Sequence, residues 1–135
     1  MAVYLANTGV LTVNSVDLSP LVTNISINRA FDELEITSLG DTGHKFVKGL
    51  EASSITIDFL NDSASAKTLQ TLNTNWGSSV TVTFKQTSAA TSAENPLYTM
   101  TCLINNTTPV NGAVADLSTQ SVTWTVNGTI AITTA

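Results

Sequence analysis

The sequence predicts a mainly β protein: an antiparallel β-sandwich or barrel with one flanking α-helix at about 64–75 and a long projecting hairpin at about 31–49. Several short segments alternate apolar and polar residues with a period of two, which is typical of half-buried strands. Threonine alternates with valine or isoleucine in many of them, and β-branched residues favour strands over helices. Helical spacing occurs in a single segment. A chain of 135 residues is expected to form one domain, 1–135, with its own core.

In the first half of the chain, four segments are expected to form strands. Alternation predicts that each strand turns one face toward the core and the other toward solvent. In the third segment, Leu34 and Ile36 are expected to point inward, whereas Glu33 and Glu35 point outward. The four segments are VLTVNSVDL (10–18), VTNISIN (22–28), ELEITS (33–38) and SITIDF (54–59).

The segment 61–77 interrupts this alternation and predicts the helix at about 64–75. Asp62 or Ser63 is suited to the N-cap, because a short polar side chain accepts a hydrogen bond from a first-turn amide. Gly77 is suited to the C-terminal cap. The apolar face that should pack on the sheet consists of Leu69, Leu72 and Trp76.

Four more strands are expected in the second half. Both alternating sets of residues in 97–104 contain apolar side chains, so this strand is expected to be covered on both faces, by the helix or by a neighbouring subunit. Cys102 lies in this apolar run and, as the single cysteine, is expected to be a core residue without a disulfide. Asn127-Gly128 is a two-residue hairpin signal between the last two segments. The segments are SVTVTFKQ (79–86), LYTMTCLI (97–104), STQSVTWTVN (118–127) and TIAIT (129–133).

Charge is scarce and unevenly distributed. Charged residues make up 11% of the chain, and the net charge is −5. The basic residues form no cluster, which argues against tight binding to a phosphate backbone. With few charges to protect its strand edges, such a chain is prone to self-association, so an assembling protein is favoured over an enzyme. Residues 32–51 nevertheless hold half of the ten carboxylates and the only histidine.

Residues 32–51 offer little for catalysis or metal binding. His44 has Asp41 nearby, but the chain lacks a Gly-x-Ser-x-Gly nucleophile motif. Glu33 and Glu35 share a strand face about 7 Å apart, a spacing common on any solvated strand. One histidine and one cysteine, far apart in sequence, do not predict a zinc site, and a weak surface calcium site stays open. We therefore predict no catalytic residue, no metal ligand and no cofactor.

A contact arm accounts for the concentration of charge. Glycines at 40, 43 and 49 mark turns, and carboxylates mixed with lysines predict a polar hairpin that projects from the sheet and meets a complementary surface. A solvated loop without a partner is the alternative. The residues assigned to the arm are Phe31, Asp32, Glu33, Glu35, Thr37, Gly40, Asp41, Gly43, His44, Lys45, Lys48 and Gly49.

The N-terminal stretch MAVYLANTG (1–9) lacks a basic region followed by an apolar one, so no secretory signal is expected. No run approaches the roughly 18 apolar residues of a membrane span. The chain is therefore expected to be made in the cytoplasm and to have no membrane partner.

Several short motifs follow one another in a specific order along the chain. They are EITSLGDTG (35–43), GL (49–50), ITIDF (55–59), the helical segment 64–75, Gly112, DL (116–117) and SVTWTVNG (121–128). This order resembles that of the tail tube proteins, the major tail proteins of long-tailed bacteriophages. In that family an acidic-apolar-threonine strand leads into a glycine turn. A Gly-Leu pair, an alternating strand that ends in an aromatic residue, a helix and the closing strands follow.

The resemblance implies a β-sandwich with one helix, six copies of which join into a ring, and rings that stack into a hollow tube. The hairpin at about 31–49 is then the stacking arm, which packs on the adjacent ring. The implied partners are further copies of the chain, other virion tail proteins, and DNA that passes through without specific binding. The implied location is the tail of the virion, after synthesis in the host cytoplasm.

Two other classes of protein share some of these features. A phage capsid decoration protein, which stabilises the head, is the main alternative, because it too is small, β-rich and self-associating. A carbohydrate-binding sandwich is the other. It would need exposed aromatic side chains, for which the chain offers Tyr4, Tyr98, Trp76 and Trp124.

Overall fold

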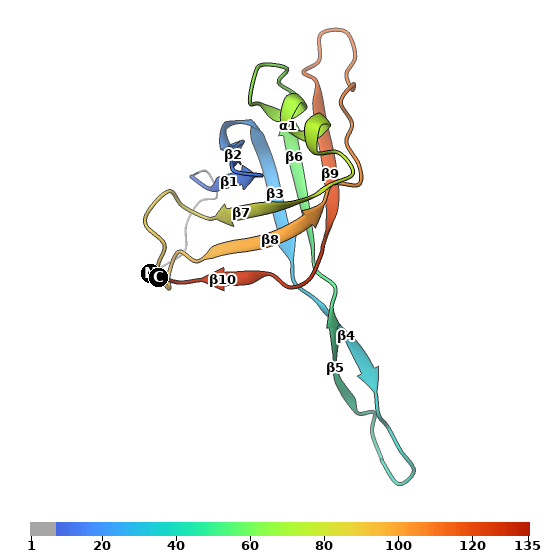
Figure 1. Ribbon diagram of the computed structural model, residues 1–135. Helices are drawn as coiled ribbons and strands as arrows, with labels where there is room; N and C mark the ends of the chain where they lie inside the picture. Colours follow the sequence, from blue (N-terminus) through green and yellow to red (C-terminus); the bar gives the residue numbers. More distant parts are fainter. Residues whose placement is uncertain (1–7) are drawn as a thin grey trace.

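The computed structural model describes residues 8–135, and Figure 1 shows a body of crossed strands with a long hairpin projecting from one end. Tyr4 and most of the N-terminal stretch 1–9 lie outside the described residues. The described part is mainly β, with one α-helix and two antiparallel sheets of eight and two strands. The predicted fold class is therefore confirmed, in the form of a sandwich that does not close into a barrel.

The eight-stranded sheet folds over into two layers. Its strand order is β2-β1-β7-β8-β9-β6-β3, with β10 also beside β8. β8 and β9 share two register pairs, Cys102 with Val126 and Leu103 with Thr125. Beyond this corner, β9, β6 and β3 run across β7, β8 and β10 (Figure 1). The strands are β1 (Val10–Val13), β2 (Val16–Asp17), β3 (Val22–Asn28), β6 (Ser54–Leu60), β7 (Ser79–Lys85), β8 (Leu97–Leu103), β9 (Thr119–Val126) and β10 (Ala131–Thr133).

The core lies between the two layers, because alternate residues of the facing strands point toward one another. β6 and β9 alternate between buried and more accessible residues along their whole lengths. Ile55 and Ile57 are fully buried, as predicted, and the rings of Phe59 and Trp124 pack with their centroids 6.3 Å apart. Apolar burial stabilises a fold by about 25 cal/mol per Å², so these strands supply much of the stability of the fold.

The helix α1 (Thr68–Asn75) begins four residues later than the sequence predicts. Ala66 adopts a left-handed conformation with a φ of 58°, which a continuous α-helix does not allow. The Asp62 carboxylate accepts a hydrogen bond from the Ala64 amide at 2.9 Å, and so it caps the preceding turn. Lys67 occupies the N-cap of α1 without a side-chain cap bond. The predicted cap at Asp62 or Ser63 is therefore wrong.

One predicted packing residue of α1 does not pack. Leu72 is fully buried and Leu69 is half-buried, whereas Trp76 is 63% exposed. Trp76 is the C-cap residue and has left the helical path, with φ −59° and ψ 130°. Gly77 follows with a φ of 82°, and its amide donates to the Ile104 carbonyl at 2.8 Å. The helical spacing therefore ends one residue before the tryptophan that it was expected to place in the core.

Two turns also differ from the sequence prediction. The segment 10–18 is a tight β1–β2 hairpin and not one strand, because Asn14 and Ser15 adopt positive φ values of 51° and 67°. Asn127-Gly128 does not join a hairpin, since β10 pairs with β8 instead of β9. Gly128 has a φ of 92°, and this turn carries the chain from one layer of the sandwich to the other.

β8 buries one face more fully than the other. Met100 and Cys102 are buried, whereas on the opposite face Leu97 and Leu103 are half-buried and Thr101 is exposed. The second cover predicted for this strand is therefore incomplete in the structure of the single chain. Burial raises the pKa of the Cys102 thiol to about 12, so this cysteine is an unreactive core residue.

Candidate functional site

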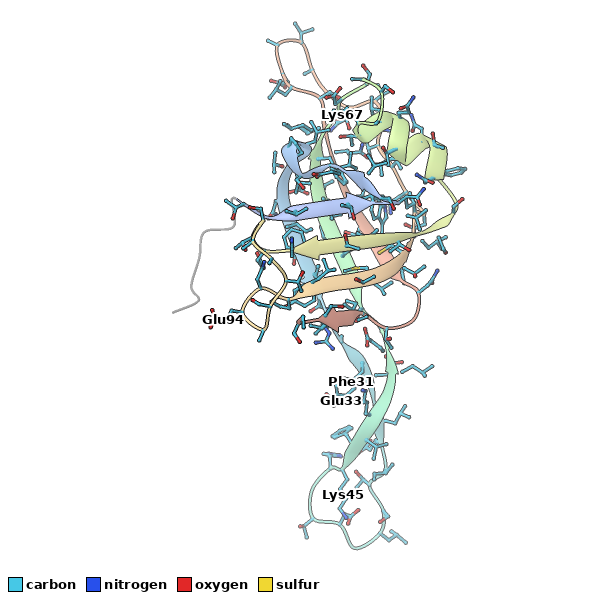
Figure 2. All side chains as sticks on the ribbon, turned by 60° about the vertical axis from the view of Figure 1, so that its left-hand side comes forward. Phe31, Glu33, Lys45, Lys67 and Glu94 are labelled. Carbon is cyan, nitrogen blue, oxygen red and sulfur yellow. The ribbon has the colours of Figure 1, made fainter. Side chains whose placement is uncertain are left out.

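The predicted arm is a two-stranded ribbon that leaves the sandwich. β4 (Phe31–Glu35) and β5 (Phe46–Glu51) pair only with each other, in a separate sheet. Figure 2 shows Phe31 and Glu33 along the ribbon and Lys45 near its far end. The predicted arm residues lie on β4 (Phe31, Asp32, Glu33, Glu35), in the connecting loop (Thr37, Gly40, Asp41, Gly43, His44, Lys45) and on β5 (Lys48, Gly49).

One face of the ribbon is apolar and uncovered. Leu34 lies opposite Val47, and the Ile36 amide extends the ladder by donating to the Lys45 carbonyl at 2.9 Å. Because Ile36 is two residues from Leu34, these side chains share a face. Leu34 and Ile36 are 53% and 52% exposed. The prediction that they point into the core is therefore wrong, because no second layer lies against the ribbon. Leu34, Ile36 and Val47 are called the apolar face of the arm below.

The opposite face of the ribbon mixes charge with aromatic rings. Glu33 lies opposite Lys48, and Glu35 lies opposite Phe46. The Lys48 ammonium is 5.6 Å from the centroid of the Phe31 ring, which is within the range of a cation–π contact. The arm is therefore an amphipathic ribbon with a different chemistry on each face.

The root of the arm depends on a close backbone approach. The β4–β5 register shifts between Phe31 and Glu33, so Asp32 forms an irregularity. A Cβ atom on Gly49 would lie 2.7 Å from the Asp32 carbonyl oxygen, closer than any side chain allows. Gly49 lies within β5 and not in a turn, so the sequence prediction that it marks a turn is wrong. Gly40 does lie in a turn, with a φ of 92°.

Asp41 orders the tip of the arm. Its carboxylate accepts a hydrogen bond from the Ser38 amide at 2.7 Å and lies 2.9 Å from the Lys45 ammonium. The Ser38 hydrogen bond and the Lys45 contact lower the pKa of Asp41. The turn that they fix presents Leu39, whose side chain is fully exposed. The tip therefore displays an apolar residue on a defined turn.

A second polar cluster joins the two sides of the tip. The His44 Nδ1 lies 2.5 Å from the Glu35 Oε2, and the Thr37 hydroxyl donates to the same oxygen at 2.9 Å. The contact with His44, and then that with Thr37, lowers the pKa of Glu35. The Lys45 amide donates to the Thr37 hydroxyl at 2.9 Å. The tip is held by side chains as well as by the strand ladder.

This cluster has no arrangement suited to nucleophilic catalysis. His44 contacts Glu35, whereas Asp41, the partner considered from the sequence, contacts Lys45. The nearby Thr37 hydroxyl donates to Glu35 and not to the imidazole. Among residues 8–135, no three His, Cys, Asp or Glu side chains gather closely enough to hold a metal ion. No helix in this part of the chain is long and apolar enough to cross a membrane.

The aromatic residues considered for sugar binding do not form a shared platform. Trp124 is fully buried, Tyr98 is half-buried, and Trp76 is exposed on a separate element. Tyr98 lines an open hollow of about 330 Å³ between the two layers of the sandwich, together with Ile25, Ile27, Arg29, Phe84 and Gln86. Arg29 is its one charged residue, so the hollow offers no pair of groups for acid–base chemistry.

An exposed apolar loop that was not predicted from the sequence lies at the other end of the molecule. The loop 105–118 joins β8 to β9 and lies opposite the arm in Figure 1. Val110, Val114 and Leu117 in this loop are 90%, 100% and 77% exposed. The available signal was three large apolar residues in a segment without alternation and with three asparagines. We call residues 105–118 the distal loop.

No protein-family model matches the chain, and a search of curated proteins finds no match. Support for a function therefore comes from the geometry of the arm and of the sheet edges, from the charge of the chain, and from the order of the sequence motifs.

Proposed function

We propose that this protein is a structural virion protein, the subunit of a phage tail tube. In this proposal six copies form a ring, rings stack into a tube, and the tube is a conduit for DNA. The order of motifs along the chain supports the family, and the projecting arm supports the mode of assembly. The proposed role is not enzymatic and requires no cofactor.

The observation that carries the proposal is the uncovered apolar surface of the arm. A two-stranded hairpin is at best marginally stable alone in water and needs a further layer. Here Leu34, Ile36 and Val47 face solvent, yet Asp41 and Glu35 hold the tip in one conformation. An ordered ribbon with an uncovered apolar face is suited to packing on a partner. A solvated loop would need neither the apolar face nor the ordered tip.

The free edge of the larger sheet supports lateral assembly into rings. β3 ends the strand order, so one side of its backbone has no strand partner in the described residues. Its seven residues, VTNISIN (22–28), include no charge and no proline, two of the features that protect an edge strand. The one irregularity in its pairing with β6 lies at its start, between Val22 and Asn24. The opposite end of the order is β2, which has two residues. When two different edges of neighbouring copies pair, the contact is heterologous. Such contacts close into a ring if the rotation from one copy to the next divides a full turn evenly.

The charge of the chain supports its role as a conduit. The net charge of −5 and the absence of a basic cluster disfavour adhesion of the phosphate backbone. DNA would therefore pass without specific binding. The remaining proposed partners are other tail proteins at the ends of the tube, and the proposed location is the virion tail.

Electron microscopy of the purified protein, with sedimentation at micromolar concentration, tests the proposal. We expect tubes made of stacked rings for the full chain. In a matched variant, Ile36–Lys45 is replaced by Asn-Gly, which joins Glu35 to Phe46 where the strands already pair. This subunit should stay folded by circular dichroism, because loop-closure entropy varies slowly with length. It should not form tubes.

Three results would contradict the proposal. Full tubes from the shortened variant would show that the arm does not stack rings. A stable monomer of the full chain that does not polymerise when seeded would argue against a tube protein altogether. Binding to phage capsids without tube formation would favour the decoration protein.

A further inference from the structure

Exposed apolar side chains concentrate at the two opposite ends of the molecule. Of the twelve large apolar residues that are exposed within residues 8–135, seven lie on the arm and three on the distal loop. Figure 1 shows the arm and the distal loop at opposite ends of the long axis, with the sandwich between them. The seven are Phe31, Leu34, Ile36, Leu39, Phe46, Val47 and Leu50, and the three are Val110, Val114 and Leu117.

Hydrogen bonds tie the first half of the distal loop to the start of β9. The Thr108 amide donates to the side chain of Gln120 at 2.9 Å, and the Asn111 side chain donates to the Thr119 carbonyl at 2.8 Å. Gln120 is itself buried. At the apex, the Asp116 amide donates to the Ala113 carbonyl at 3.0 Å and closes a turn around Val114. The apex therefore presents its apolar side chains on an ordered turn.

We propose that the arm of one subunit packs on the distal loop of the subunit in the next ring, so that Leu39 and the apolar face of the arm cover Val110, Val114 and Leu117. This inference rests on the proposed function and names the surface that receives the arm. Two different patches at opposite ends make a heterologous contact, which repeats along an axis without closing. Such a contact lengthens a tube by the same step at each ring.

Charge repulsion on the arm is weaker from the distal loop than from a second arm. Residues 31–49 carry four carboxylates and two lysines, so two arms laid together would bring like net charges into contact. The distal loop carries one charge, Asp116. Lys67, labelled at the same end of the molecule in Figure 2, forms no ion pair with any of residues 8–135 and is free to meet an arm carboxylate. A contact between two distal loops would leave the larger apolar surface of the arm uncovered.

Cysteine cross-linking between two variants tests this contact. Leu39→Cys and Val114→Cys are separate chains, mixed before assembly and treated with a short bis-maleimide linker. Both sites are fully exposed, so the variants should fold normally. Cys102 is buried with a pKa raised to about 12 and should not react. Leu39→Cys mixed with Ile132→Cys is the matched control, because Ile132 is exposed on β10, outside both ends.

We expect a heterodimer of the Leu39→Cys and Val114→Cys chains, identified by mass spectrometry, and at least tenfold less product in the Ile132 control. Homodimers of Leu39→Cys would show that arms pack on arms, and homodimers of Val114→Cys that loops pack on loops. Either result would overturn the inference.

Electron microscopy of the same mixtures separates this inference from the proposed function. Tubes without the heterodimer would be consistent with the proposed tube, but would show that the arm packs on a surface other than the distal loop. Heterodimer without tubes would retain the arm–loop contact and reject the tube. In a second variant, Val114→Asp adds a carboxylate opposite the acidic arm. It should remain folded and lose tube formation, and unchanged tubes would count against the inference.

Discussion

The β6–β9 pair in the sandwich and the β4–β5 pair in the arm are both antiparallel ladders, yet they differ in what covers them. β6 and β9 pair from Ser54 with Thr125 to Leu60 with Thr119, and alternate residues are buried. In β4 every residue is exposed, including Leu34. The same alternation therefore specifies a strand in both places. It specifies burial only where a second layer exists.

The arm therefore has the composition of a half-buried strand without its own second layer. A ribbon with an apolar face is held in place by side-chain contacts at the tip and by a tight approach of Gly49 to Asp32 at the root. In the sandwich, burial itself holds the strands. Four changes to the two regions test this difference.

The largest effect is expected from a leucine-to-alanine change in the body compared with the same change in the arm. Leu72 is fully buried, so Leu72→Ala should cost about 2–5 kcal/mol in the free energy of unfolding. Leu34→Ala should change it by less than about 0.5 kcal/mol, because the side chain is exposed, and should weaken tube formation. Urea denaturation measures both. An equal loss of stability would show that the arm folds as part of the core.

The next effect should be confined to the arm. In Gly49→Ala the new methyl group meets the Asp32 carbonyl oxygen, and relieving that overlap should cost about 1–3 kcal/mol of local stability. Amides of β4 and β5 should exchange faster with solvent, while those of β6 and β9 keep their protection. Gly43→Ala is the matched control, since no atom lies within 4 Å of its added Cβ. Faster exchange in β6 would contradict a separate arm.

Acid should loosen the tip of the arm. The pKa values of Glu35 and Asp41 are lowered by their contacts with His44 and Ser38, from 4.5 and 3.8. The unfolded tip therefore binds protons at a higher pH than the ordered tip. The stabilisation is complete above about pH 5 and is lost as the pH falls through the lowered values. NMR titration of the Ser38 amide measures this loss of stabilisation. In Asp41→Asn, the part of the pH dependence that is due to the Asp41 carboxylate should disappear.

The smallest effect is expected from a single exposed charge on the arm. Glu33→Gln removes a carboxylate that lies opposite Lys48 and leaves the ladder intact. Subunit stability should stay within about 0.5 kcal/mol, as for most surface changes. At low salt the protein concentration needed for tube formation should rise slightly. The difference should fade near 0.1 M salt, where the screening length is about 10 Å. A difference that persists at high salt would indicate a buried contact.

Most of the strands and the position of the projecting hairpin could be predicted from local sequence patterns. Alternation in 54–59 and 118–127 is local, and it gives the strand and its inward face when a core is present. The expectation of an arm at about 31–49 agrees with β4 and β5, because glycines and charge in this stretch are also local signals. Cys102 was predicted as a core residue from the apolar run around it and is buried.

Which side chains of those segments are buried, and which strands pair across a turn, depends on the tertiary structure. Leu34 and Ile36 have the alternation of core residues but lie where the chain has left the sandwich. Asn127-Gly128 has the sequence of a hairpin turn, yet β10 pairs with β8 and not with β9. Trp76 falls just beyond the last helical residue. Periodicity and turn residues are properties of a few neighbours in sequence. Burial depends on elements far apart in the chain, and so no local pattern fixes it.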